Sequence, residues 1–454
     1  MGILRRLWPI AVVCLCLLVL AGGIGGVAGS FGDSETSVAN SFTAWSSTLW
    51  LQTTQADFEA GIPIQANTRS SSGDVGLARA NFIFALQGGS AAFWGYNVAA
   101  NSWASMIGAP NTVGDGGALA YDGARYIYAF RGGGNNRAFW RYDTTLGVWT
   151  VLPNAPTNVG AGASLIHDGS RYVYAFRGNN QTDFWAYDTT SNSWAPRTAA
   201  PARVGAGGSL AYDRFRYIYA FRGNTTRTFW RYDASGNTWA AMANTPLGGT
   251  VGPGGRLVYD GSRYIYAFRG NGQTPFWQYD ILSNTWTVLA NTPAGVGAGG
   301  ALAYAGSGYI YAFRGNGTAA FWRYDVFSNS WTSMTNALGN VTSGGSLAFV
   351  AASTYVGSAT MSSQVRDTGK AGARWDALFW GETLQLNTDI TFQVRASDTL
   401  FAANNGTLTW TSAGGTSPVT SGLPSGRYMQ WRAVLTTSDT AVTPVLHEVR
   451  LYHY

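Results

Sequence analysis

Residues 309–325 read YIYAFRGNGTAAFWRYD, and this stretch decides the fold. Aromatic and small side chains alternate at its start and again near its end, which predicts two half-buried strands. Gly-Asn-Gly stands between them, and these residues tolerate the positive φ of a tight turn. The stretch therefore predicts two antiparallel strands joined by a hairpin.

The Phe-Trp pair of this stretch is one of six in the chain, which are spaced 45 to 47 residues apart. A second tryptophan follows each pair by nine residues. A fixed period of this length indicates stacked supersecondary units. The pairs are Phe93-Trp94, Phe139-Trp140, Phe184-Trp185, Phe229-Trp230, Phe276-Trp277 and Phe321-Trp322, and the second tryptophans are Trp103, Trp149, Trp194, Trp239, Trp286 and Trp331.

Each unit contains four short strand-like pieces with no room for a helical crossover, so neighbouring strands must be antiparallel. The first piece, 299–304 in the last unit, reads GGALAY, which suits the crowded axis of a ring. Four such strands per unit are typical of a propeller blade. We expect an all-β fold over 81–350, a six-bladed kelch-like β-propeller, with the tryptophans filling the space between blades.

The first and last units are incomplete in complementary ways. The first unit begins at 82–88 without a full axial strand, whereas 344–349 (GGSLAF) follows the sixth unit as a spare axial strand. We predict that this spare strand completes the first blade and closes the ring, which removes open sheet edges. A seventh blade is the alternative.

The repeats resemble kelch repeats over about 270 residues. A kelch unit has two glycines after its second strand, then a tyrosine and a tryptophan; here strand two ends in Arg-Gly, so an arginine replaces the first glycine. Kelch propellers are mainly binding platforms. The copper radical oxidases of that fold use cysteine and histidine ligands. This chain has cysteine only at Cys14 and Cys16, in the N-terminal segment, so the sequence argues against that chemistry.

The N-terminal segment 1–30 is typical of a secretory signal: Arg5 and Arg6 precede an apolar stretch, and small residues follow. An uncleaved membrane anchor is the alternative. Residues 31–44 resemble the segment after the leader of camelysin/TasA-type surface proteins. Both features imply an exported protein at the cell surface or outside the cell. Both cysteines lie in the leader, so the mature chain has no disulfide or thiolate chemistry.

Residues 351–454 alternate polar and apolar side chains, which predicts a β-sandwich. The runs 363–369, 391–395 and 426–432 resemble a jelly-roll module of bacterial surface proteins, often adhesive or glycan-binding. Residues 31–80 are expected to hold the export-type segment and a linker, with the first sandwich strand as a further assignment. The propeller would then be inserted into the sandwich domain, because a closed propeller has adjacent ends.

Five blades carry one arginine at an equivalent position, and the following loops carry asparagine. A ring of guanidinium groups suits carboxylate, sulfate or phosphate, and amides suit sugar hydroxyls. The structural alternatives are that each arginine stacks on an aromatic ring or pairs with a repeated aspartate, and that each asparagine belongs to a solvated turn. The candidate ligand-binding residues are Arg131, Arg177, Arg222, Arg269, Arg314, Asn179, Asn224, Asn271 and Asn316.

The sequence excludes several classes of function. The net charge is +6 without any lysine or arginine run, which argues against nucleic-acid binding. The repeated aspartates, such as Asp143, are interpreted as turn residues rather than cation ligands. No Ser/His/Asp grouping, zinc spacing or phosphate loop stands out, so we expect no metal, no cofactor and no enzymatic activity.

We therefore expect an exported, surface-associated binding or adhesion protein whose partner is a glycan, an anionic polymer or a protein. Contact with a membrane is expected only through an uncleaved N-terminal segment. The oligomeric state and the ligand's identity stay open. A structural surface-layer or fibre subunit and a propeller-type carbohydrate-active enzyme are the alternatives.

Overall fold

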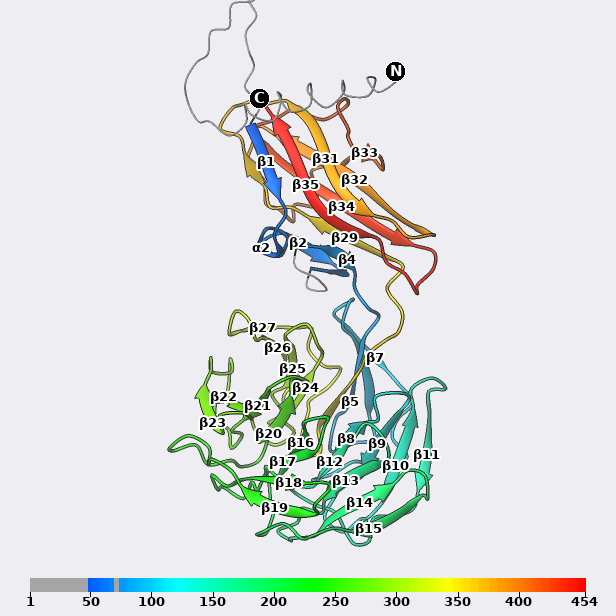
Figure 1. Ribbon diagram of the computed structural model, residues 1–454, viewed down its shortest axis with the longest axis vertical. Coiled ribbons are helices and arrows are strands. Elements are labelled where there is room, and N and C mark those ends of the chain that lie inside the picture. Colours follow the sequence, from blue (N-terminus) through cyan, green and yellow to red (C-terminus); the bar gives the residue numbers. More distant parts are fainter. Residues whose placement is uncertain (1–47, 69–72) are drawn as a thin grey trace, which may run out of the picture. The chain divides into compact units, whose positions relative to one another are not determined.

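The computed structural model describes residues 48–68 and 73–454, and its secondary structure there is nearly all β (Figure 1). The one helix in these ranges is α2 (Gln55–Glu59), which Thr54 and Asp57 cap reciprocally. None of the helical structure described is long and apolar enough to cross a membrane. The predicted signal, 1–30, and the camelysin-like segment, 31–44, lie outside the described residues.

Six four-stranded antiparallel sheets form the propeller, each with the same up-and-down order. Blade 1 contains β28 (Ser346–Val350), β5 (Phe82–Leu86), β6 (Phe93–Asn97) and β7 (Ser102–Ser105); blade 2 contains β8 (Ala118–Tyr121), β9 (Tyr126–Phe130), β10 (Phe139–Asp143) and β11 (Val148–Leu152); blade 3 contains β12 (Ser164–His167), β13 (Tyr172–Phe176), β14 (Phe184–Asp188) and β15 (Ser193–Pro196). Blade 4 contains β16 (Ser209–Tyr212), β17 (Tyr217–Phe221), β18 (Phe229–Asp233) and β19 (Thr238–Ala241); blade 5 contains β20 (Arg256–Tyr259), β21 (Tyr264–Phe268), β22 (Phe276–Asp280) and β23 (Thr285–Val288); blade 6 contains β24 (Ala301–Tyr304), β25 (Tyr309–Phe313), β26 (Phe321–Asp325) and β27 (Ser330–Ser333).

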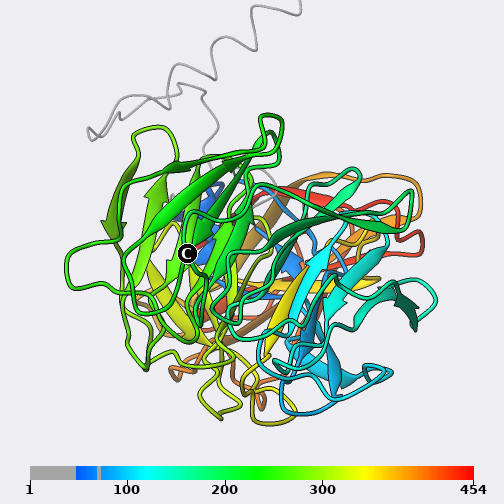
Figure 2. The ribbon, with the colours of Figure 1, turned by 90° about the horizontal axis from the view of Figure 1, so that it is seen from below.

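The ring closes in the predicted way. Strand β28 pairs with β5 from Ser346 opposite Leu86 to Val350 opposite Phe82, so the C-terminal axial strand completes the first blade. The axial strands β8, β12, β16, β20, β24 and β28 contact one another in this order, and β28 contacts β8 again. Seen from below, the sheets follow each other in chain order from cyan through green to yellow (Figure 2). The described chain therefore forms a six-bladed, closed β-propeller.

Aromatic side chains from neighbouring blades form the core between the blades. Between blades 3 and 4, for example, Phe184 packs edge-to-face on Tyr232 and on Trp239 at centroid distances of 4.8 and 5.1 Å. Phe176 stacks on the same Trp239 at 5.7 Å. Because each aromatic side chain buries a large area, this repeated packing stabilises the ring without a disulfide.

Each second tryptophan also crosses to the preceding blade with its indole nitrogen. Trp239 Nε1 donates to the carbonyl of Thr198 at 2.9 Å, and Trp103 Nε1 donates to the carbonyl of Thr335 at 3.0 Å. The second of these bonds joins blade 1 to blade 6. The expectation that the tryptophans fill the space between blades is confirmed, and they tether the blades as well.

Two further sheets form the β-sandwich. One contains β1 (Thr48–Gln52), β35 (Val445–His453), β4 (Val75–Leu77), β3 (Ala66–Asn67) and β31 (Trp375–Thr383); the other contains β2 (Ile62–Ile64), β29 (Ser358–Ser362), β34 (Tyr428–Thr437), β32 (Thr388–Ser397), β33 (Thr411–Gly414) and β30 (Arg366–Asp367). One apolar cluster contains residues of both sheets. Within it, Trp380 of β31 stacks on Phe392 of β32 at 4.4 Å.

Strands from before and after the propeller segment share these two sheets. Strand β1 pairs with β35, from Thr48 opposite His453 to Gln52 opposite Val449, and β2 pairs with β29. Gln52 Oε1 accepts a hydrogen bond from the buried indole of Trp431 at 2.7 Å. In the sequence, the propeller segment therefore lies between strands that pair with each other. The two connecting segments also pair with each other, at the bridge between Arg79 and Tyr355.

Candidate functional sites of the propeller

The five repeated arginines lie at the end of the second strand of blades 2 to 6, half-buried. In each, Nε donates to the carbonyl of the residue 19 positions earlier, in the connection from the preceding blade. The donor–acceptor distances lie between 3.0 Å at Arg131 and 3.3 Å at Arg269. Each arginine therefore fixes the loop that leads into its own blade.

Blade 1 makes the same contact with a different side chain. Gln87 occupies the arginine position, and its amide nitrogen donates to the carbonyl of Asn340 at 2.9 Å. Asn340 directly precedes Val341, just as Arg203 precedes Val204 in the bond made by Arg222. A glutamine therefore reproduces the structural part of the arginine's role without its charge.

The charged ends of these arginines have few partners within the described chain. Arg177 Nη1 pairs with Asp183 at 2.9 Å. In Arg131, Arg222, Arg269 and Arg314, no described residue accepts a hydrogen bond from an Nη nitrogen. Neither structural alternative for the repeat, stacking on an aromatic ring or pairing with a repeated aspartate, describes these contacts.

The four asparagines follow two positions after the arginines and are exposed. All have positive φ, between 54° and 58°, as expected for the tip of a tight hairpin. Each backbone N–H donates to a carbonyl at the start of the axial strand of the same blade; Asn224, for example, bonds the carbonyl of Ala206 at 2.8 Å. The asparagines therefore stand next to the glycine-rich entrance to the axis.

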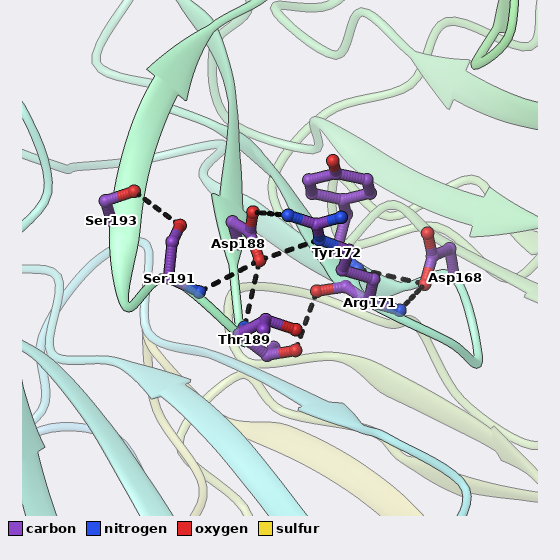
Figure 3. Close-up of polar contacts among 8 residues, drawn as sticks. Asp168, Arg171, Tyr172, Asp188, Thr189, Ser191 and Ser193 are labelled. Atoms are coloured by element: carbon purple, nitrogen blue, oxygen red, sulfur yellow. Dashed lines mark hydrogen bonds and ion pairs between the residues drawn. The ribbon is translucent and has the colours of Figure 1, made fainter.

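The repeated aspartates belong to turns, as interpreted from the sequence. Asp168 Oδ1 accepts the backbone N–H groups of residues 170 to 172, and Asp188 Oδ1 accepts those of 190 and 191. Figure 3 shows the bonds to Arg171, Tyr172 and Ser191. Arg171 bridges the two turns, because its guanidinium pairs with Asp188 at 2.5 Å (Figure 3). This second repeated arginine was not predicted from the sequence. It pairs with aspartate in four blades: Arg125–Asp143, Arg171–Asp188, Arg216–Asp233 and Arg263–Asp280.

Two cavities lie along the propeller axis. The smaller, of about 180 Å³, is lined by the glycine-rich starts of the axial strands, and the larger, of about 700 Å³, by the axial strands themselves. None of the nine candidate residues from the sequence lines either cavity. Arg256 lines both. Arg256 was not among the site residues predicted from the sequence, although the equivalent residues of the other blades are alanine or serine.

The sandwich contains a Thr–His–Asp arrangement that the sequence did not indicate. Thr383 Oγ1 lies 2.7 Å from His447 Nε2, and His447 Nδ1 lies 2.7 Å from Asp74 Oδ1. These residues are 64 and 373 positions apart in the chain, so no local motif reveals them. Neither axial cavity includes them. The three side chains link β31 and β35 to the segment that leads into β4.

Within the described ranges, no three His, Cys, Asp or Glu side chains gather in a way that would hold a metal ion. His167 replaces the tyrosine of its repeat neighbours, and its ring is buried and stacked on Tyr128 at 5.8 Å. Burial lowers the pKa of His167. His167 Nδ1 accepts the backbone N–H of Gly169, so this histidine belongs to a turn next to the blade core.

The fold defines the class of the protein as a β-propeller, on the evidence of six sheets and a closed ring. No protein-family model matches the sequence, and no curated protein sequence matches it. Among solved structures, one described as "Structure of YjhT" is similar, with a TM-score of 0.41 and 14% sequence identity. The match covers 55% of this chain and 90% of that one.

Proposed function

We propose that this chain is an exported, surface-associated, non-enzymatic binding protein whose propeller binds an anionic glycan or polymer. The observation that carries the proposal is the arginine ring of blades 2 to 6. One hydrogen bond from Nε fixes each guanidinium, while four of the five have Nη groups without a partner in the described chain. Such a pre-oriented fork suits a carboxylate or a sulfate.

The neighbouring loops support the same proposal. Each exposed asparagine stands two residues after an arginine, so amide groups alternate with guanidinium groups along the same loops. Amides bind sugar hydroxyls, and guanidinium groups bind the charged substituents. The leader-like segment 1–30 and the camelysin-like segment 31–44 support export to the cell surface. The kelch-like repeat and the jelly-roll-like sandwich are typical of binding modules.

Arginine-to-glutamine variants test this function sharply, because Gln87 already makes the structural bond in blade 1. We expect the wild-type chain to bind uronate-containing or sulfated glycans on an array. The variant Arg222→Gln/Arg269→Gln/Arg314→Gln should keep its thermal midpoint and lose most of this binding. The alanine triple variant should lose stability as well, because the loop bond is removed.

Two results would contradict the proposal. The first is a wild-type chain that retains no anionic glycan on the array. The second is a glutamine triple variant that binds as well as the wild type, which would assign the arginines to the loops alone.

A further inference from the structure

The axial strands break their repeat at one position, the first residue of β20. The equivalent residues in blade order are Ser346, Ala118, Ser164, Ser209, Arg256 and Ala301. Five of these side chains are small, as the crowded axis requires. The arginine instead reaches to the next two blades of the ring, because its Nε donates to Gly300 O of blade 6 at 3.1 Å and its Nη2 to Gly345 O of blade 1 at 3.3 Å.

Arg256 is an incompletely bonded cation inside the ring. A guanidinium group carries five N–H donors, and these two carbonyls take two of them. No ion-pair partner of Arg256 is found among the described residues. Two carboxylates that line the larger cavity, Asp122 and Asp168, each accept three backbone N–H groups of their own turns. Burial lowers the pKa of Arg256 to about 10, so the group stays charged at neutral pH.

Arg395 in the sandwich is an arginine whose hydrogen-bond donors are satisfied within the chain. Arg395 is 2% exposed, and its Nε and Nη2 both donate to Gln430 Oε1. Backbone carbonyls of Asn405, Leu408 and Ala403 take further N–H groups. Arg395 thus makes five hydrogen bonds, whereas Arg256 makes two. Because Arg256 is only partly buried, its remaining N–H groups are open to the axial cavities and are available to a group from outside the chain.

Serine hydroxyls share the layer of Arg256 around the axis. The oxygens of Ser346, Ser164 and Ser209 accept the backbone N–H groups of Leu119, Leu210 and Leu257, at 3.0 to 3.1 Å. Because each oxygen accepts from the neighbouring strand, its own hydrogen is left to donate. The layer therefore offers one guanidinium and three hydroxyl donors to the larger cavity, which all four residues line.

We propose that Arg256, with the serines of its layer, binds the carboxylate of a small organic acid in the larger axial cavity. The positive charge of Arg256 and its planar guanidinium fork match a carboxylate. The cavity volume of about 700 Å³ lies within the usual range of ligand pockets, roughly 300–1,000 Å³. The remaining walls combine apolar side chains with tyrosine, and His167, Asp122, Asp168 and Arg214 also line the cavity. This mixture of apolar and polar groups suits an organic acid as large as a monosaccharide. This site is separate from the arginine ring and does not depend on it.

Calorimetric titration of the full chain with D-glucuronate tests the proposal, with D-glucose as the neutral probe of the same size. We expect saturable one-to-one binding of D-glucuronate and none of D-glucose. In Arg256→Ser, which carries the residue of three other blades, affinity should fall about tenfold or more, as expected for loss of charge-assisted hydrogen bonds. Arg263→Ser, at an exposed arginine that pairs with Asp280 in a turn and lies in neither site, is the matched control and should bind like the wild type. Arg222→Gln is measured beside it to detect binding at the arginine ring.

Absence of saturable D-glucuronate binding to the wild type would overturn the proposal, as would equal affinity in Arg256→Ser. Binding that is lost in Arg222→Gln and kept in Arg256→Ser would overturn it too, and would place the ligand at the arginine ring. If Arg256→Ser fails to fold, crystals of the wild-type chain grown with D-glucuronate decide the matter. A carboxylate at the Arg256 guanidinium supports the site, and an axial cavity without the ligand contradicts it.

Discussion

Arginines with different neighbours do different work in this molecule. Those in the turns between strands one and two pair with the repeated aspartates, and several on strand three stack on tyrosine, as Arg231 does on Tyr217 at 4.1 Å. The repeated arginines at the end of strand two bond loop carbonyls. The arginines of the chain therefore divide into those with structural partners and a smaller set that retains N–H donors without a partner in the described chain.

The aspartate–arginine pairs make stability depend on pH. The Arg125 guanidinium holds the pKa of Asp143 down at about 2, below the unfolded value of about 3.9. A lowered carboxylate pKa contributes stability that is present above the unfolded pKa and is lost as the pH falls through the folded one. We expect Asp143→Asn to be less stable than the wild type at pH 7, and this difference to shrink between about pH 4 and 2. Urea unfolding at several pH values checks this, and a difference that stays constant across that range would contradict it.

Gly178, which directly follows Arg177, shows how closely the backbone segments approach at the start of the axial strand. Gly178 has a φ of +66°, and a Cβ there would lie 2.3 Å from the backbone nitrogen of Ala163. We expect Gly178→Ala to destabilise the fold by about 1–3 kcal/mol, because the backbone must shift. Gly169→Ala is the control, since Gly169 has a φ of +78° and open space around it. Thermal unfolding of both variants separates the destabilisation by the steric clash from that by the positive φ. An equal loss of stability in both would argue against the close approach at Gly178.

At the scale of elements, the fourth strand of each blade and the turn before it hold that blade to the preceding one. The second tryptophans stack between blades and bond backward to a carbonyl of the preceding blade. Asn284 adds a parallel link: its Oδ1 accepts the Tyr279 hydroxyl at 2.7 Å and the backbone N–H of Ala243 in the preceding blade. The cohesion of the ring is therefore a sum of repeated neighbour-to-neighbour contacts.

Removing one indole N–H measures the contribution of the hydrogen bond to such a contact, apart from that of the ring packing. In Trp239→Phe the ring contacts with Phe176 and Phe184 are largely kept, but the bond to the Thr198 carbonyl is lost. We expect a loss of about 0.5–1.5 kcal/mol, the usual net value of one hydrogen bond. Chemical denaturation of this variant measures it. Phe215→Ala, at a side chain that is 86% exposed, is the control and should change stability little; an equal effect in both would contradict this role.

At the scale of the whole molecule, the ring closes through strands that are far apart in the chain. Strand β28 completes blade 1, and Trp103 joins that blade to blade 6. The sandwich is likewise built from strands on both sides of the propeller segment. Each of the two bodies thus depends on pairing between distant parts of the sequence.

This closure predicts that the propeller folds alone. We expect residues 79–353, expressed by themselves, to unfold in one cooperative thermal transition. Residues 79–344 lack β28, so blade 1 loses its axial strand and the transition should broaden and shift to lower temperature. Circular dichroism of the two fragments checks this. Identical melting curves would show that closure by β28 contributes nothing.

The sequence predicted the propeller because its evidence is local and repeated. Each strand alternates within five residues, and the spare strand at 344–349 matched the missing one in blade 1. The contacts of the arginines were not predictable in this way, because the bond from Arg222 to the Arg203 carbonyl depends on how two loops meet. Arg256 was visible as a break in the repeat, but its meaning depends on six strands that converge on one axis. The link between His447 and Asp74 joins residues too distant for any motif.

The central claim is that the propeller's arginine ring binds anionic polymers, and one titration tests it most directly. The full wild-type chain and the Arg222→Gln/Arg269→Gln/Arg314→Gln variant are titrated with polygalacturonate at low and high NaCl. We predict wild-type binding that weakens as salt rises, because salt screens exposed charges, and little binding by the variant at either salt concentration. Equal binding by both proteins, or no binding by the wild type at low salt, would contradict the account.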